Sequence, residues 1–539
     1  MFFIERREGA APLMTKVTSL RRTIVMKKFH AEVIILEREI YTSTHELYDV
    51  LCPLRSDVLC RGDALFRHWL PQIQRTRFVY SAWNLAFYLA LRCHDLRKIQ
   101  RSLLPLVLSS LGRGEARAIT NLDAVMASLG RICHEPEDKF IPYPQTKRFF
   151  YGDALLGYNT GRIFGTTKTG TRIMVTLPTE AAEDDGTLIR NLVAAGMDCA
   201  RINCAHDFRD VWDTMISYIR QAESETGHHC KVYMDLAGPK VRIASVLLRY
   251  GEAKVLPGEQ VFLVSGAISS YPSDYTGNIV LSCSIPEVFK NLQSGQPVLI
   301  DDGKIRAVVE SLTEKGAYLK ITYTKPKGGK IKNQKSLNFP QTPMDLSPLT
   351  EKDKEDLDFV VHHADAIGYS FVKSAADVAL LQKELKKRCG KSFHHLALVA
   401  KIENKEAVDN LPDIIVQAAS RQPLGIMIAR GDLAVEVGYR RLAELQEEIM
   451  WICEAAHVPV IWATQVLENL VKTGLPSRAE ITDAAMGERA ECVMLNKGPY
   501  IVEAVTVLTN ILQRMEQHQY KKTSQLRALH IAEYVFEGL

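Results

Sequence analysis

Short apolar runs alternate with helical patterns through most of the chain after Thr171. The runs are rich in β-branched residues, and each is followed by apolar positions spaced three or four residues apart. Eight runs follow this pattern: TRIMVTL, DCARINC, KVYMDLAG, DAIGYSFV, LALVAKIE, GIMIARGD, PVIWATQ and ECVMLN. Strands that alternate with helices form parallel sheets, so the pattern predicts an α/β protein with a (β/α)₈ TIM barrel over 171–243 and 333–518. A doubly wound open sheet is the alternative.

Two regions depart from this alternation. Residues 244–332 hold β-branched runs punctuated by Gly, Pro and Asp-Gly, which predicts an inserted antiparallel β-domain that could close over the barrel as a lid. Residues 46–140 show apolar residues at helical spacing, which predicts an all-helical N-terminal domain. A proline-containing linker is expected over 141–170, and tails are expected over 1–45 and 519–539.

Composition excludes several classes of protein. The 539 residues are 46% hydrophobic, which allows several domains, and the net charge of +4 gives no argument for a nucleic-acid or membrane partner. The 11 cysteines form no CxxC pair, so neither a disulfide framework nor a zinc site is expected. A reducing compartment follows, most simply the cytoplasm, although the basic first forty residues leave an organelle transit peptide open.

Charged and polar residues gather where the predicted strands end. They are Arg201, Asn203, His206, Asp235, Arg242, Lys401, Glu403, Arg430, Asp432, Thr464 and Gln465. The carboxyl ends of parallel barrel strands share one rim, which is where ligands bind. Glu403 and Asp432, on either side of a helix expected over 404–419, could hold Mg²⁺, and Lys401 could neutralise a transferring phosphoryl group. The alternative is that Lys–Glu and Arg–Asp pairs only hold the rim together.

The motifs KIEN, ARGDL, ATQVLE and PSRAE occur in this order within about 171–515, and together they resemble the pyruvate kinase family. The resemblance implies a barrel with an inserted β-domain. It also implies a kinase of glycolysis that transfers a phosphoryl group between phosphoenolpyruvate and ADP, forming pyruvate and ATP with Mg²⁺ or Mn²⁺.

The resemblance also assigns roles to single residues. Lys401, Arg201 and Thr464 match catalytic residues: Lys401 stabilises the transferring phosphoryl group, Arg201 binds the substrate phosphate, and Thr464 lies beside the enolate carbon. Glu403 and Asp432 match the metal ligands. The substrate carboxylate is expected on the backbone amides of Arg430, Gly431 and Asp432. The nucleotide side is expected to include Asn203, His206, Arg242 and Lys335.

Several positions depart from the family pattern. Ala205 replaces a Ser, Leu236 and Ala237 replace a Thr-Lys pair, Ala434 replaces a Gly, and residues 496–499 replace a Ser-Gly-Glu-Thr segment. The first two changes remove oxygen ligands of K⁺. Lys240 stands where the family has Glu, so its ammonium is expected to replace that ion beside Asp235, and K⁺ is not expected to be required.

The ends of the chain suggest how activity is regulated. The chain ends at Leu539, so no C-terminal regulatory domain and no activation by a sugar bisphosphate are expected. The helical N-terminal region resembles pyruvate kinase-like proteins with such an extension. Two alternatives stay open, a non-catalytic relative that binds phosphoenolpyruvate and a metal-dependent lyase acting on pyruvate, and so does a homo-oligomer.

Overall fold

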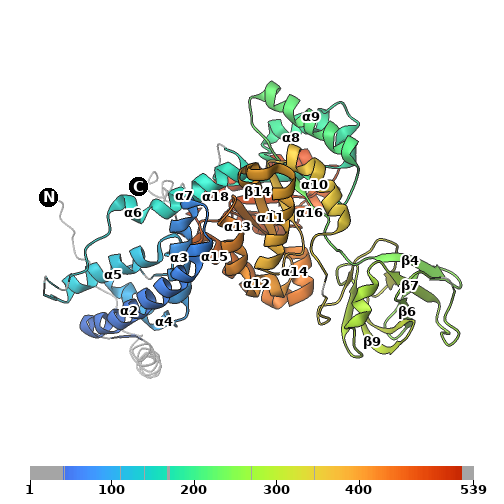
Figure 1. The fold of residues 1–539 in the computed structure, drawn as a ribbon, viewed down its shortest axis with the longest axis horizontal. Helices are drawn as coiled ribbons and strands as arrows, with labels where there is room; N and C mark the ends of the chain where they lie inside the picture. The colour runs from blue at the N-terminus through green and yellow to red at the C-terminus, as the bar shows by residue number, and fades with distance from the viewer. Residues whose placement is uncertain are drawn as a thin grey trace, which may run out of the picture. The chain divides into compact units, whose positions relative to one another are not determined.

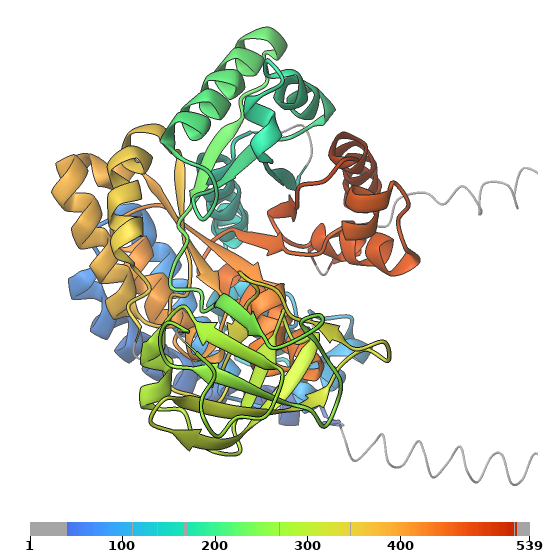
Figure 2. The same cartoon turned by 90° about the vertical axis from the view of Figure 1, so that its right-hand side faces the viewer.

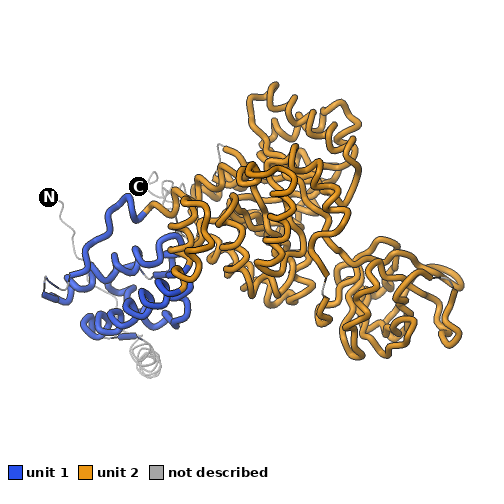
Figure 3. Tube along the Cα trace, viewed as in Figure 1, with its two compact units in different colours: residues 1–64, 86–149 blue, residues 65–85, 150–539 orange. Residues whose placement is uncertain are grey.

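The computed structural model describes residues 40–524, except residues 42, 110, 137, 139, 167–169, 269, 345 and 522. The chain divides into two compact units, one formed by 1–64 and 86–149 and the other by 65–85 and 150–539 (Figure 3). Most of the two predicted tails, at 1–39 and 525–539, lies outside the described residues.

The first unit is helical, as predicted. Helices α4 (Arg97–Leu103) and α5 (Ala118–Ile132) lie within it, whereas α2 (Thr44–Trp69) and α3 (Thr76–Arg92) each run on into the second unit. Residues 65–85 therefore group with the barrel, although the sequence pattern placed them in the helical domain. In the part of the chain that the structure describes, no helix is both long and apolar enough to cross a membrane.

The second unit contains a closed barrel of eight parallel strands, as the alternating pattern predicted (Figures 1 and 2). In barrel order, the strands are β1 (Arg172–Thr176), β17 (Cys492–Leu495), β16 (Val460–Ala463), β15 (Leu424–Ala429), β14 (Ala397–Ile402), β13 (Ala366–Tyr369), β3 (Lys231–Asp235) and β2 (Cys199–Asn203). Every residue of β14 and β15 is buried, which explains why these strands are apolar, except for Lys401, rather than alternating.

Helices cover the outside of the barrel. They are α8 (Thr187–Ala195), α9 (Arg209–Thr226), α10 (Glu351–His363), α11 (Ala375–Cys389), α12 (Lys405–Asp409), α13 (Leu411–Ala419), α14 (Arg430–Val437), α15 (Tyr439–Ala455), α16 (Glu468–Thr473), α17 (Arg478–Gly487) and α18 (Ile501–Glu516). Capping boxes begin α10, α11 and α17, where the first-turn carboxylate bonds the capping residue in return.

The helix expected over 404–419 is in fact two helices. Asn404 caps the start of α12, and Asn410 caps its end. Pro412, in the first turn of α13, has no amide hydrogen to donate to the backbone hydrogen bond that a continuous helix would form. The predicted linker over 141–170 also holds helices, α6 (Thr146–Phe149) and α7 (Tyr151–Phe164).

Helix α7 closes the end of the barrel opposite the rim. Ile163 and Phe164, at its carboxyl end, are buried in one apolar cluster with barrel residues that include Cys199, Tyr233 and Met427. A segment expected to connect two domains is therefore part of the barrel core. After α18, a two-stranded hairpin is formed by β18 (Gln519–Tyr520) and β19 (Thr523–Ser524).

The inserted β-domain runs from Ile243 to Asn338, whereas the predicted range was 244–332. Its main sheet has the order β12 (Leu337–Asn338), β8 (Pro297–Ile300), β9 (Ile305–Thr313), β10 (Gly316–Tyr323), β6 (Gln260–Val264), β7 (Ile279–Cys283) and β4 (Ile243–Leu248). A second pair is formed by β5 (Lys254–Val255) and β11 (Gly329–Lys330). The prediction of an antiparallel domain was wrong for one pair, because β6 and β7 run parallel.

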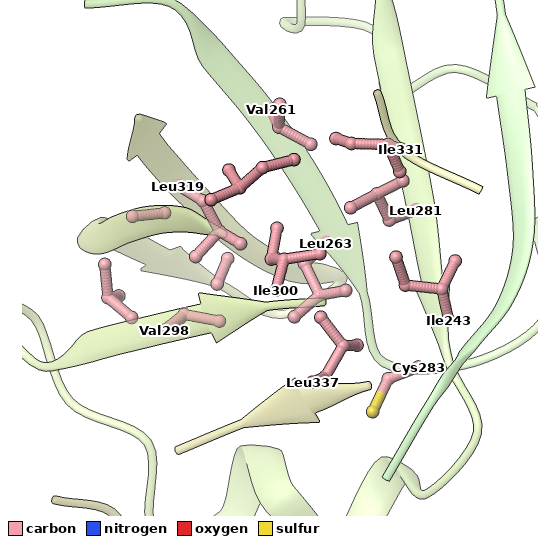
Figure 4. Close-up of a cluster of buried hydrophobic side chains, with 14 of the residues drawn as sticks. Ile243, Val261, Leu263, Leu281, Cys283, Val298, Ile300, Leu319, Ile331 and Leu337 are labelled. Atoms are coloured by element: carbon pink, nitrogen blue, oxygen red, sulfur yellow. The ribbon is translucent and has the colours of Figure 1, made fainter. Parts of the chain in front are cut away.

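The β-domain has an apolar core of its own. Side chains such as Leu263, Ile300 and Leu337 come from different strands and point toward one another (Figure 4). Val241, just before β4, belongs to the same core. The short connection between β3 and Val241 therefore joins two separately packed bodies.

Candidate functional site

Four charged side chains at the carboxyl ends of neighbouring barrel strands form one connected set. Arg201 lies on β2, Asp235 ends β3, Lys401 lies on β14, and Glu403 follows β14 directly. Arg201 Nε donates to Asp235 Oδ2 at 3.1 Å, and Lys401 Nζ lies 3.3 Å from the same oxygen and 3.0 Å from Glu403 Oε1. The structure therefore brings the predicted phosphate-binding Arg201 and the predicted phosphoryl-stabilising Lys401 to the same oxygen of one carboxylate.

Burial and pairing together fix the charges of this set. Burial alone would favour the neutral form of each group. Lys401 and Arg201 outweigh burial at Asp235 and lower the pKa of its carboxyl, while Asp235 outweighs burial at both bases and raises their pKa values. The two cations are consequently held in place, charged and nearly dehydrated, before any substrate arrives.

Uncharged neighbours that sequence reasoning did not select orient these groups. Ser370 Oγ accepts a hydrogen bond from Lys401 Nζ at 2.7 Å and donates to the Leu236 carbonyl at 2.8 Å. Thr176 Oγ1, at the end of β1, accepts from Arg201 Nη1 at 2.9 Å. Both residues stand at or directly after a barrel strand, so their position at a strand end could have identified them.

A glycine allows this close arrangement. Gly368 on β13 packs against the buried end of β3, and a Cβ added there would lie 2.3 Å from Asp235 Oδ1. Tyr233, also buried, donates its hydroxyl to that oxygen at 3.3 Å. Any side chain at position 368 would displace the carboxylate to which Arg201 and Lys401 bind.

The two predicted metal ligands line one cleft of about 400 Å³, which we call the acidic cleft. Its charged lining residues are Glu403, Glu406, Asp409, Asp432, Glu436, Lys240, Lys373 and Lys405. Glu403 Oε2 accepts from the Phe371 amide at 2.6 Å, and Asp432 lies in the first turn of α14. The carboxylates thus come from adjacent strand ends, as the sequence predicted.

The electrostatics of these two acids suit a cation. Burial and the nearby Asp432 raise the pKa of Glu403, although Lys401 acts in the opposite direction. A divalent cation between the two carboxylates would relieve this repulsion, and hard oxygen donors are the ligands that Mg²⁺ and Mn²⁺ prefer. Among the described residues no group of three or more His, Cys, Asp or Glu side chains could hold a metal. Two protein carboxylates would leave the remaining positions to substrate and water.

Lys240 lies elsewhere than predicted. Its Nζ is 2.8 Å from Asp432 Oδ1, on the metal side of the site, rather than beside Asp235. Asp235 is already bound by Arg201 and Lys401, whereas Asp432 faces the connection that carries Lys240 from β3 to the β-domain.

The predicted carboxylate-binding segment begins α14. The guanidinium of Arg430 is bound to Asp483, donates to the Ala463 carbonyl at 2.8 Å and stacks 4.4 Å above the Trp462 ring. This side chain therefore holds β15 to the elements beside it, and only the backbone of Arg430 is left for substrate. The Gly431 amide donates to Thr464 Oγ1 at 2.9 Å, a bond that a substrate carboxylate would have to replace.

Thr464 lies in a strained turn after β16. Thr464 and the following Gln465 have φ angles of 69° and 60°, in the left-handed region that non-glycine residues rarely adopt. Such strain is often kept where a side chain must be aimed at a ligand. Here the turn places the Thr464 hydroxyl against the amide of Gly431.

A second cleft of about 390 Å³ is lined by Arg201, and we call it the basic cleft. Its charged and amide lining residues are Arg201, Asn203, His206, Asp207, Glu468, Lys472, Asn496 and Lys497. Partial burial, Lys497 and Arg242 together lower the pKa of His206. The cleft therefore has an excess of positive charge that an anion would relieve.

The four predicted nucleotide residues are only partly brought together. Asn203 and His206 line the basic cleft, whereas Arg242 Nη1 donates to the Gln334 carbonyl at 2.9 Å and Lys335 Nζ lies 2.9 Å from Asp301 Oδ1. Arg242 and Lys335 thus lie at the base of the β-domain. Sequence reasoning missed Lys497, although it lies only two residues after the end of β17.

Comparison with known proteins defines the class of this barrel. Residues 168–505 match the family model described as the pyruvate kinase barrel domain. A pyruvate kinase of Agrobacterium vitis is 32% identical over 348 residues, which cover 63% of this chain and 68% of the relative. A pyruvate kinase of Methylorubrum extorquens is 33% identical, covering 64% and 69%, and one of Geobacillus stearothermophilus is 31% identical, covering 65% and 57%. The chain belongs to the pyruvate kinase family.

Proposed function

We propose that the protein is a pyruvate kinase, which transfers a phosphoryl group from phosphoenolpyruvate to ADP. The observation that carries the proposal is the set formed by Arg201, Asp235, Lys401 and Glu403. It places two dehydrated cations at one rim beside a pair of acids. Phosphoryl transfer requires little covalent chemistry from a protein, since positioning and charge stabilisation dominate. Family membership and the position of the set at the ligand-binding rim support the same reaction.

Each residue then has a physical task. The Arg201 guanidinium binds the phosphate of phosphoenolpyruvate, because its planar donors match phosphate oxygens. The bond between phosphorus and the enol oxygen breaks, its electron pair stays on that oxygen, and phosphorus bonds a terminal oxygen of ADP. Lys401 stabilises the negative charge that moves during this transfer, because Asp235 and Ser370 hold its ammonium in advance.

The enolate then takes a proton at carbon and becomes pyruvate. Thr464 lies at the same rim, and its hydroxyl contacts the Gly431 amide, on which the substrate carboxylate would bind. We assign Thr464 to the positioning of this proton or of the water that carries it.

Glu403 and Asp432 would hold a divalent cation, Mg²⁺ or Mn²⁺. When bound, the metal would supply positive charge to the phosphoryl and enolate oxygens. The raised pKa of Glu403, which burial and Asp432 cause, supports this assignment, since a divalent cation would favour the ionised carboxylate.

We further propose that the reaction needs no K⁺. Leu236, which replaces an oxygen ligand of the ion, is buried, and Ala205 offers no side-chain oxygen. Arg201 and Lys401 already neutralise Asp235. Turnover in tetramethylammonium salts should change little when KCl is added at constant ionic strength.

The proposed activity is tested by measuring pyruvate formed from phosphoenolpyruvate with and without ADP. We expect pyruvate only when ADP and a divalent cation are both present. Pyruvate formed at the same rate without ADP would indicate hydrolysis. Formation of neither pyruvate nor ATP, with phosphoenolpyruvate still bound, would identify a non-catalytic relative.

A further inference from the structure

Lys240 occupies a position that the proposed reaction leaves unexplained. It lies on the connection between β3 of the barrel and β4 of the β-domain, and its Nζ is 2.8 Å from Asp432 Oδ1. Asp432 is one of the two acids that would hold the metal. A protein cation therefore rests on the carboxylate that a divalent cation would use.

The charges around the rim are balanced without a metal. Arg201, Lys401 and Lys240 oppose Asp235, Glu403 and Asp432, and each acid has at least one of these cations within 3.3 Å. A divalent cation entering this set meets Lys240 as a like charge at its own ligand. Coulomb repulsion over such a distance disfavours binding in the partly dehydrated cleft.

Lys240 also differs from Lys401 in its freedom to move. The Lys401 side chain is 11% exposed and bonds Asp235, Glu403 and Ser370, whereas the Lys240 side chain is 26% exposed and bonds Asp432 alone among the described residues. Lys401 is a fixed part of the rim. Lys240 can exchange one anionic partner for another.

The backbone on either side of Lys240 is held by different bodies. On the barrel side, the amides of Ala237 and Gly238 donate to Asp353 Oδ1 at 2.9 and 3.3 Å, and Asp353 belongs to the first turn of α10. On the other side, Val241 is packed in the β-domain core, and its carbonyl accepts from the Leu337 amide at 2.9 Å. Lys240 therefore stands at the pivot between the barrel and the β-domain.

We propose that Lys240 is a built-in competitor of the divalent metal, which weakens metal binding to Asp432 until an anionic substrate gives the ammonium a new partner. The inference rests on the proposed metal site. Its consequence is coupling: substrate should strengthen metal binding, and metal should strengthen substrate binding by the same factor. Removal of the Lys240 charge should strengthen metal binding in the absence of substrate and reduce this coupling.

The test is a titration of the full-length protein with Mn²⁺, following free Mn²⁺ by electron paramagnetic resonance, with and without phosphoenolpyruvate and without nucleotide. In the absence of phosphoenolpyruvate, Lys240→Met should bind Mn²⁺ about tenfold more tightly than the natural protein. Phosphoenolpyruvate should then improve Mn²⁺ affinity less in Lys240→Met than in the natural protein. Lys240→Arg, which keeps the cation, should behave like the natural protein.

Lys373→Met is the matched control for charge. Lys373 lines the same acidic cleft, but its ammonium bonds the Met344 carbonyl rather than an acid. We expect Lys373→Met to change Mn²⁺ affinity less than threefold. An equal gain in Mn²⁺ affinity in Lys373→Met and Lys240→Met would show that the effect comes from the overall charge of the cleft. That result would overturn the proposal.

Glu403→Gln separates failure of this inference from failure of the proposed metal site. If Glu403→Gln abolishes Mn²⁺ binding but Lys240→Met binds like the natural protein or more weakly, the metal site stands and the competitor role is wrong. If Glu403→Gln binds Mn²⁺ like the natural protein, or no variant binds it, the metal site and the competitor role both fail.

Discussion

The acidic and basic clefts differ in how their charged groups are held. In the acidic cleft Glu403 and Asp432, the proposed metal ligands, each contact a protein cation, and Glu403 is buried with partners for both oxygens. In the basic cleft His206 is exposed and repelled by Lys497 and Arg242, which come from different parts of the chain. The two acids of the first cleft are paired before ligands bind, whereas in the second cleft Lys472 is paired with Glu468 and the charge of Lys497 acts on His206. Variants should therefore have large effects at the first cleft and smaller effects at the second.

The largest effect is expected for Lys401→Met. This change removes the charge that stabilises the transferring phosphoryl group, so kcat should fall by about 10³-fold while phosphoenolpyruvate still binds through Arg201. Initial rates and calorimetric binding of phosphoenolpyruvate would measure the two effects separately. Lys373→Met, which removes a lysine that bonds only a carbonyl, is the control. Turnover of Lys401→Met equal to that of the control would exclude the assigned role.

Glu403→Gln should have the next largest effect. The amide keeps the size of the side chain but loses its charge, so divalent metal should bind about 10²-fold more weakly and activity should require correspondingly more metal. Activity titrated against MgCl₂ would give the shift. The nearby exposed Glu406→Gln serves as control, and an identical metal requirement in the two variants would place the metal elsewhere.

The two predicted nucleotide residues outside the basic cleft should respond less. Arg242→Ala and Lys335→Met remove partly exposed cations at the base of the β-domain, so each should raise KM for ADP by roughly tenfold or less. KM for phosphoenolpyruvate should stay within about twofold, since Arg201 and Lys401 are untouched. A rise in KM for phosphoenolpyruvate alone would reverse the assignment of these residues to the nucleotide.

The smallest effect concerns stability rather than rate. Burial, together with Asp432, raises the pKa of Glu436 to about 7, above its ordinary value of 4.5. The folded protein then binds this proton more tightly than the unfolded chain, so the group costs stability as pH rises from 4.5 through 7. Glu436→Gln should match the natural protein at pH 5 and exceed it by roughly 2 kcal/mol at pH 8. Thermal unfolding at the two pH values would measure this difference in the free energy of unfolding. A gain in stability of Glu436→Gln at pH 5 but not at pH 8 would contradict the predicted direction of the pH dependence.

The sequence predicted the barrel because its strands are mostly buried and mostly apolar, with β14 and β15 buried throughout. It predicted the acidic side of the site because a charge directly after such a strand must lie at the rim, as Lys401 and Glu403 do. It did not predict that α7 is part of the barrel core, since prolines before it suggested a linker. Its apolar contacts, such as that of Phe164, join distant parts of the chain.

Other features depended on tertiary structure. The prediction for Lys240 named Asp235 as its partner, but Arg201 and Lys401 already occupy that carboxylate and the ammonium lies on Asp432. The parallel pair β6–β7 follows from the order of strands in the β-domain, which local alternation of apolar residues does not encode. The sequence pattern thus located the charged residues at the rim, whereas tertiary packing determines which of them form ion pairs.

The most direct test of the account is ³¹P nuclear magnetic resonance of one mixture that contains the protein, phosphoenolpyruvate, ADP and Mg²⁺. We expect the phosphoenolpyruvate signal to decline while the γ-phosphate signal of ATP grows by an equal amount. In the Lys401→Met variant, both changes should stop. Two results would contradict phosphoryl transfer to ADP. One is a decline of the phosphoenolpyruvate signal that is matched by inorganic phosphate, and the other is a phosphoenolpyruvate signal that persists although Mg²⁺ and ADP are present in excess.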